Sequence, residues 1–171
     1  SVYGSSKLAG EAALQTLLPD RHTTIRTSWL YSEYGKNFVQ TMLRLMKQKD
    51  ELGVVADQFG SPTSTHSLVA LLLTILGQEI KPGIYHWTDG ASISWYEFAQ
   101  AIQQEAIDQG LLRRKIPIKP LTTKEYSATA VRPSYSVLDR SETLSDIGIQ
   151  ATDWQQELRL VIKQIAKRTG D

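Results

Sequence analysis

Tyr3 and Lys7 are the residues of this chain whose types and spacing point most directly to chemistry. They lie four residues apart at the head of a helical pattern, and four residues are about one helical turn, so both side chains fall on one face. A free phenol has a pKa of about 10, and a neighbouring ammonium favours its phenolate form. Such a phenol can give a proton to a carbonyl oxygen or accept one from an alcohol. The alternative is a chance pair on an exposed helix, although only Tyr3 among the seven tyrosines has a lysine four residues on.

Two residues of the stretch "RTSWLY" are candidates for binding a ligand. Arg26 and Trp29 lie on a predicted strand that directly follows the helix of Tyr3 and Lys7. Ligands of open α/β sheets bind at the carboxyl ends of the strands, and a tryptophan there can cover a flat group such as a sugar ring or a base. The alternative is a tryptophan of the core.

Two later stretches are also candidates. The segment "DQFGSPTST" is long and polar for a connection, and functional residues concentrate on such loops. In "RPSYSVLD", Arg132 precedes a proline that stiffens the backbone, and an arginine held in this way suits a phosphate or a carboxylate. The alternatives are an ordinary turn for the first stretch and a surface salt bridge for the second.

Composition excludes several classes of function. The chain has 171 residues, 41% of them apolar, and its 19 basic and 18 acidic residues give a net charge of +1. No run of like charge predicts a nucleic-acid or membrane partner, and no apolar run is long enough to cross a bilayer. There is no cysteine, and the three histidines show no metal-ligand spacing. We therefore expect a cytoplasmic protein with no metal site formed by histidine or thiolate.

Helical and strand patterns alternate along the chain and predict an α/β fold. Capping-box pairs, Ser94 with Glu97 and Thr122 with Glu125, mark the starts of two helices. Helices are predicted over residues 5–18, 36–50, 65–76 and 95–109, briefly after residue 122, and from about residue 153 to the end. Strands are predicted over residues 23–31, 52–57 and 83–89, with an edge strand at 115–121, a loop over 58–65 and an extended stretch over 132–139.

The ordered set of motifs resembles one family. The segment "VYGSSKLAGE" is similar to the catalytic segment of the extended short-chain dehydrogenases/reductases. The stretches that follow it in order resemble the dTDP-4-dehydrorhamnose reductases within that family: "RTSWLYSEYGKNFVQTMLRL", "VVADQFGSPTST", "GIYHWTDGASISWYEFAQAI" and "RPSYSVLD". The resemblance runs from Val2 to about Ile165, and "RTSWLY" together with "DQFGSPT" is its most specific part.

The resemblance implies the reduction of the C4 ketone of dTDP-4-dehydro-L-rhamnose, a nucleotide-linked sugar, by NADPH or NADH. Tyr3 would donate the proton to the ketone oxygen, and Lys7 would make Tyr3 more acidic and hold the nicotinamide ribose. Trp29 would line the sugar pocket, and Arg132 would bind the diphosphate. The loop expected to border the substrate contains Gln58, Phe59, Gly60 and Pro62. A homodimer and an interfacial Mg²⁺ ion are known among such reductases, but no carboxylate cluster in the sequence assigns the ion to residues.

The resemblance also implies a division of the chain. Residues 1–57 would be the last helix and strand of a Rossmann-type dinucleotide-binding domain, and residues 58–171 mostly a substrate-binding domain with some elements returning to the Rossmann sheet. The glycine-rich phosphate loop of the family is absent. We therefore expect a carboxyl-terminal piece of a longer enzyme, which by itself binds NAD(P)H negligibly, is inactive, and self-associates or is only marginally stable through an exposed apolar face.

Two other functions remain open at this point. A regulatory relative, such as the β subunit of methionine adenosyltransferase, would bind a partner enzyme without catalysis, and we expect that subunit to lack Trp29. A nucleotide-sugar epimerase or dehydratase would keep Tyr3 and Lys7 with other residues in the sugar pocket.

Overall fold

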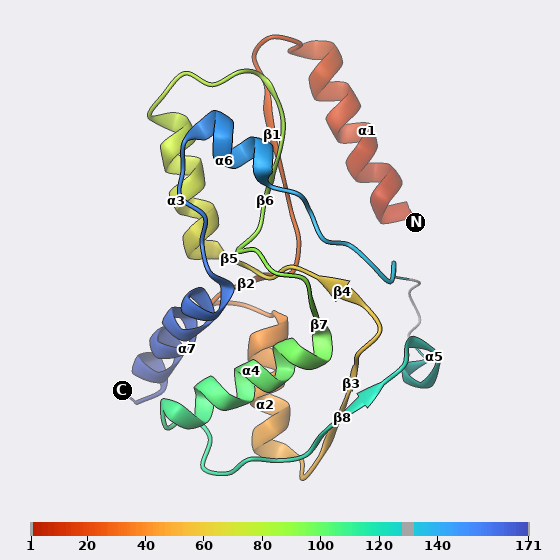
Figure 1. Ribbon diagram of the computed structural model, residues 1–171, viewed down its shortest axis with the longest axis vertical. Coiled ribbons are helices and arrows are strands. Elements are labelled where there is room, and N and C mark those ends of the chain that lie inside the picture. Colours follow the sequence, from red (N-terminus) through yellow and green to blue (C-terminus); the bar gives the residue numbers. More distant parts are fainter. Residues whose placement is uncertain (1, 128–131, 171) are drawn as a thin grey trace.

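The computed structural model describes residues 2–127 and 132–170, in which helices alternate with short strands (Figure 1). The helices are α1 (Val2–Leu17), α2 (Phe38–Gln48), α3 (Thr65–Leu76), α4 (Trp95–Asp108), α5 (Thr123–Tyr126), α6 (Ser141–Ile147) and α7 (Trp154–Gly170). The strands are β1 (Thr23–Thr27), β2 (Leu30–Tyr31), β3 (Leu52–Val55), β4 (Phe59–Gly60), β5 (Thr63–Ser64), β6 (Gly83–Trp87), β7 (Ile93–Ser94) and β8 (Ile118–Leu121). The predicted α/β class is confirmed.

The described strands form four pairs that join distant parts of the chain. Strand β1 runs parallel to β6, with Ile25 opposite Tyr85, and β3 runs parallel to β8. The two-residue strands β2 and β5 are also parallel, whereas β4 and β7 are antiparallel. The parallel pairs require crossover connections, which α2, α3 and α4 help to supply.

Two apolar cores lie in the two parts of the molecule. In the lower part of Figure 1, α2, α4 and α7 pack together around fully buried Phe98, Ile102 and Leu158. In the upper part, a smaller core gathers Leu71 of α3 and Trp87 of β6 with residues of α6. Trp154, Leu158, Val161, Ile162 and Ile165 recur at helical spacing and predict an apolar face for the last helix. The last four are buried and Trp154 is partly buried, which confirms this face.

Local helix signals are also confirmed. The Ser94–Glu97 and Thr122–Glu125 capping boxes both form, with each side chain bonded to the other residue's backbone. Asp153 accepts hydrogen bonds from the first backbone N–H groups of α7, at 2.9 and 3.0 Å. The first helix begins at Val2, earlier than predicted, and helix α6 was missed because its seven residues are too few to show a clear period.

The predicted strand over residues 23–31 is wrong in one respect, because it breaks at Trp29. The backbone of Trp29 has φ +47°, in the left-handed region, which no strand residue adopts. The break divides the segment into β1 and β2, and β2 pairs with β5 of the predicted loop over residues 58–65. That loop therefore contains two short strands.

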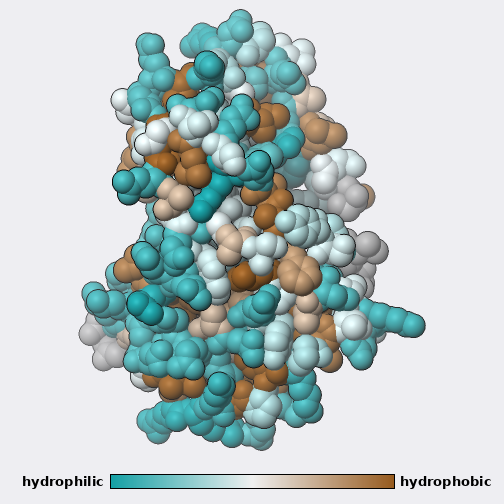
Figure 2. Space-filling view, in the orientation of Figure 1, coloured by the Kyte–Doolittle hydropathy of each residue, from teal (hydrophilic) through white to brown (hydrophobic). Residues whose placement is uncertain are grey.

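Helix α1 lies apart from both cores. None of its residues is buried, and its stripe of Leu8, Ala12, Ala13 and Leu17 is exposed. Arg26 of β1 connects this helix to the rest of the molecule by donating two hydrogen bonds to the Glu11 carboxylate, at 2.8 and 2.5 Å. Figure 2 shows hydrophobic residues at the surface in this upper part, over the regions of α1 and α3.

Candidate active site

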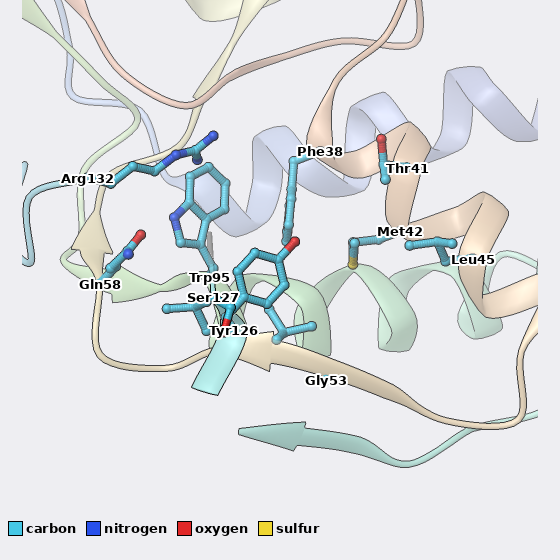
Figure 3. A pocket seen from close by; sticks show the side chains of 12 residues that line it. Phe38, Thr41, Met42, Leu45, Gly53, Gln58, Trp95, Tyr126, Ser127 and Arg132 are labelled. Carbon is cyan, nitrogen blue, oxygen red and sulfur yellow. The ribbon is translucent and has the colours of Figure 1, made fainter. Parts of the chain in front are cut away.

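A cavity of about 620 Å³ lies between α2, β3, α5 and the start of α4 (Figure 3). This volume is within the range of small-molecule sites, about 300–1,000 Å³. Aromatic and apolar side chains from α2 and α4 form one wall, and polar groups converge from the loop after β3 and from Arg132. The lining residues are Phe38, Thr41, Met42, Leu45, Gly53, Val54, Val55, Gln58, Trp95, Tyr126, Ser127 and Arg132.

Trp95, the first residue of α4, is the central aromatic side chain of this wall. Its ring stacks on that of Trp29, with 3.5 Å between the centroids and 14° between the planes. Phe38 packs against it at 4.6 Å, and the guanidinium carbon of Arg132 lies 6.0 Å from its ring. A flat ring and a cation on one wall suit a ligand that joins a planar group to an anion.

Gln58 and Asp57 hold α5 at the edge of the cavity. The buried Gln58 amide donates to the Thr123 hydroxyl at 3.0 Å. The Asp57 carboxylate accepts from the backbone N–H of Thr123 at 2.9 Å and from its hydroxyl at 2.7 Å. These bonds, the backbone one foremost, lower the pKa of Asp57. Tyr126 of α5 is thereby placed at the cavity.

The other predicted loop residues do not line the cavity. Phe59 pairs its backbone with the segment after Arg132, donating to the Ser134 carbonyl at 2.8 Å. Gly60 lies against the ring of Trp29. Pro62 is buried, and its carbonyl accepts from the backbone N–H of Asp89 at 3.0 Å.

Of the predicted site residues, the structure therefore brings Gln58 and Arg132 to the cavity. Trp29 contacts the lining residue Trp95, and Gly60 contacts Trp29. Phe59 and Pro62 are not among the lining residues. Sequence reasoning missed Trp95, Phe38 and Tyr126 as lining residues. The position of Trp95 directly after the capping residue Ser94 could have indicated a lining residue. The side chain of the first helical residue stays near the exposed end of the helix.

Tyr3 and Lys7 lie on one face of α1, as their spacing predicts. The Lys7 Nζ atom is 5.4 Å from the centroid of the Tyr3 ring. Tyr3 is 73% exposed, and within the described residues neither side chain lines the cavity. The guanidinium of Arg26, another predicted binding residue, donates a hydrogen bond to the Glu11 carboxylate. This hydrogen bond is the main reason that the pKa of Glu11 is lowered.

A buried polar cluster outside the cavity fixes the segment after β6 to the start of α3 and to the segment before α7. Asp89, almost fully buried, accepts from the Ser64 backbone at 2.6 Å, from the Thr152 hydroxyl at 3.0 Å and from the Ser67 hydroxyl. Burial raises the pKa of Asp89, and these hydrogen bonds oppose that effect. The contacts tie three elements together, so we assign this carboxyl a structural role.

Comparison with known proteins decides the family. The sequence model of the RmlD substrate binding domain matches residues 1–167. The chain belongs to the RmlD substrate-binding domain family. Within this family it is 45% identical, over 92% of its length, to a dTDP-4-dehydrorhamnose reductase of Aggregatibacter actinomycetemcomitans. It is also 41% identical, over 96% of its length, to the spore coat polysaccharide biosynthesis protein SpsK of Bacillus subtilis.

The chain spans about half the length of these relatives, 55% of the first and 54% of the second. A solved structure shows the same relation. The dTDP-4-dehydrorhamnose reductase of Bacillus anthracis, crystallised with NADP, superposes with a TM-score of 0.86 at 36% identity, over 96% of this chain and 56% of its own. A UDP-glucose 4-epimerase of Thermotoga maritima, at 14% identity and a TM-score of 0.72 over 99% of this chain and 54% of its own, shares the fold alone.

Proposed function

We propose that this chain is the substrate-binding part of an NAD(P)H-dependent dTDP-4-dehydrorhamnose reductase, which reduces the C4 ketone of dTDP-4-dehydro-L-rhamnose to dTDP-L-rhamnose. The observation that carries the proposal is the juxtaposition of Tyr3 and Lys7 on one face of α1, in a chain 45% identical to such a reductase. A phenol beside an ammonium supplies the proton that a ketone oxygen needs as it becomes an alcohol.

In this mechanism Tyr3 donates its proton to the sugar C4 oxygen, and the Lys7 ammonium stabilises the phenolate that is left. The nicotinamide cofactor supplies a hydride to the C4 carbon when it is bound. Lys7 is exposed and free of carboxylate ion pairs within the described residues, so it suits hydrogen bonds to the ribose hydroxyls of that cofactor. The chain itself contains no glycine-rich loop for the cofactor's phosphates.

The cavity is the proposed site for the nucleotide part of the substrate. Arg132 binds the diphosphate, and Trp95 offers a ring face or edge to a planar group. Gln58 and Tyr126 border the same space. Trp29 supports Trp95 from behind, together with the loop that carries Phe59, Gly60 and Pro62.

The division at residues 57 and 58 is also part of the proposal. A Rossmann-type sheet consists of parallel strands covered by helices. The parallel pair β1 and β6, with α1 and α3 beside it, has this arrangement. Strand β6 follows the proposed boundary and pairs with β1, which precedes it, so β6 is an element that returns to the first domain. Of the elements after residue 58, β4, β5, β7, β8, α4, α5 and α7 form the substrate-binding domain, against which α2 of the first part packs.

No metal is assigned in this proposal. Within residues 2–127 and 132–170 there is no group of three or more histidine, cysteine, aspartate or glutamate side chains that could hold an ion. None of the helices in these residues is both long and apolar enough to span a membrane.

The test is the Tyr3→Phe variant of the full-length reductase of which, by this proposal, the chain is a part. We expect kcat to fall by about 10²–10⁴-fold, the usual worth of a general acid, with little change in substrate binding. Steady-state rates of NAD(P)H oxidation, with the product identified by NMR, measure both effects. Tyr34→Phe, at another exposed tyrosine, is the matched control and should retain full activity. A Tyr3→Phe enzyme with near-normal turnover would remove Tyr3 from the mechanism.

A further inference from the structure

Gly60, Trp29 and Trp95 form consecutive layers that end at the cavity wall. The glycine backbone touches the ring of Trp29, the ring of Trp29 stacks on Trp95, and Trp95 lines the cavity. The guanidinium of Arg132 lies on the cavity side of this arrangement, 6.0 Å from the Trp95 ring (Figure 3).

Gly60 allows the close approach in the first layer. A Cβ atom at residue 60 would lie 2.5 Å from Cε2 and 2.7 Å from Nε1 of the Trp29 indole. A rigid fused ring cannot bend out of the way as the end of a flexible side chain could. The backbone of Gly60 is not in the left-handed region, so the approach of the indole, and not the backbone conformation, is what requires a glycine.

Hydrogen bonds hold the backbone at Ser28 and Trp29, where the Trp29 carbonyl accepts from the Thr63 backbone N–H at 3.3 Å. Its left-handed φ of +47° is unusual for a bulky residue. The Ser28 hydroxyl donates to the Ser61 carbonyl at 2.7 Å, and the Thr63 hydroxyl donates to the Ser28 carbonyl at 2.7 Å. A group added at residue 60 therefore displaces the ring of Trp29 more easily than its backbone.

A displacement of the Trp29 ring also affects Trp95, which lines the cavity. Two rings 3.5 Å apart and nearly parallel have no space between them, so a shift of Trp29 breaks the stack or pushes Trp95 toward Arg132. We propose that Gly60 is a positioning residue, whose missing side chain sets, through the Trp29–Trp95 stack, where Trp95 stands in the ligand cavity. The effect on ligand binding rests on the proposed function, whereas the effect on the stack does not.

The test compares Gly60→Ala with Gly83→Ala in the 171-residue chain. A Cβ atom at residue 83 would meet nothing within 4 Å, and its φ is not left-handed, so this variant is the matched control. The first readout is the exciton couplet that two stacked indoles give in circular dichroism. The second is the affinity for dTDP, measured by calorimetry. We expect Gly60→Ala to diminish the couplet and to weaken dTDP binding about tenfold, and Gly83→Ala to change neither.

A double-mutant cycle separates the ring contact from any other effect of the alanine. Without the indole, residue 60 has no ring to displace, so Gly60→Ala should change the melting temperature and dTDP affinity far less in a Trp29→Ala background than in the native one. If Gly60→Ala alone does not fold, folding of the double variant supports the proposal. Equal effects in both backgrounds, or an unchanged couplet in Gly60→Ala, would overturn it. If dTDP fails to bind the unmodified chain, the proposed function is contradicted, while the couplet and melting temperatures still decide the role of Gly60.

Discussion

Two features of the surroundings of Arg132 favour an anionic ligand. Its guanidinium lies over the edge of an aromatic wall, 6.0 Å from the Trp95 ring. It makes no ion pair with a carboxylate in the described part of the chain, so its five donors are available to a diphosphate. The proline that follows it limits the backbone conformations of residue 132 and keeps the guanidinium near the cavity.

Arg132→Ala should weaken binding of dTDP to the chain. Since the residue is exposed and its charge is screened by solvent, we expect a loss of about three- to tenfold, or about 0.7–1.4 kcal/mol. Calorimetric titration with dTDP measures it. Thymidine is the control ligand, because it lacks the diphosphate and should bind both proteins equally. A loss that is the same for both ligands would show that Arg132 does not bind the diphosphate.

Helix α4 links the large core to the cavity. Its inward face, including Phe98 and Ile102, is fully buried, and its first residue, Trp95, lines the cavity. The Ser94–Glu97 capping box fixes the start of this helix, with Ser94 itself buried. Helix α5 has the same capping box but buries none of its residues. The two capping boxes therefore make the same hydrogen bonds, but only the one at Ser94 begins a helix that belongs to the large core.

Ser94→Ala should destabilise the protein by about 0.5–2 kcal/mol, the usual cost of losing a capping side chain. The loss also frees Trp95 at the first turn, so the circular-dichroism signal of the stacked tryptophans should decrease. Thr122→Ala removes the matching cap of α5 and should leave global stability almost unchanged. Chemical denaturation of the two variants makes the comparison. If they lose equal stability, the cap of α4 has no special importance to the core.

Helix α1 is attached to β1 by the charged pair of Glu11 and Arg26. Hydrogen bonding to Arg26 lowers the pKa of Glu11, so the attachment is fully present above the usual glutamate pKa and is lost as pH falls through the lowered value. An isolated helix of this length is only marginally stable in water. Release of the pair should therefore allow α1 to unfold before the cores do.

Arg26→Ala should produce the same release at neutral pH. We expect faster hydrogen exchange at the amides of α1 in this variant, with unchanged protection in α4 and α7. Arg21→Ala, at an exposed arginine between α1 and β1, is the control and should leave exchange unchanged. Acid titration followed by far-ultraviolet circular dichroism should show an early loss of helix in the native chain that is absent from Arg26→Ala. Protection of α1 in both arginine variants would mean that other contacts hold the helix.

At the scale of the whole molecule, apolar surface is unevenly distributed. The part with α1, α3, β1 and β6 has a small core and leaves large side chains exposed, among them Leu17 at 76%, Leu73 at 64% and Leu76 at 82%. The part with α2, α4 and α7 encloses the larger core. Contiguous exposed apolar surface favours association, so this part is expected to be covered by further protein.

The chain should accordingly self-associate through the exposed leucines of α3. Sedimentation velocity over a range of concentrations should show a mass that rises with concentration. Leu73→Lys together with Leu76→Lys should reduce that rise, whereas Leu160→Lys, at a partly exposed leucine of α7, should not. A single monomeric species at all concentrations would contradict the prediction.

The sequence by itself determined the features that depend on neighbours within one or two turns. The capping boxes at Ser94 and Thr122, the apolar face of the last helix and the common face of Tyr3 and Lys7 all formed as predicted. Each involves residues three or four apart, whose relative positions follow from helix geometry alone. The motif order was likewise enough to indicate the family.

Only the tertiary structure decided what surrounds the cavity. The left-handed turn at Trp29, its stack on Trp95 and the contact with Gly60 join the segment between β1 and β2 to β4 and α4, which lie far from it in the chain. No local pattern encodes such contacts, because they depend on how sheets and helices pack against one another. For the same reason Trp29, predicted to line the pocket, lies behind Trp95, and the exposed stripe of α1 could not be distinguished from a buried one by its period.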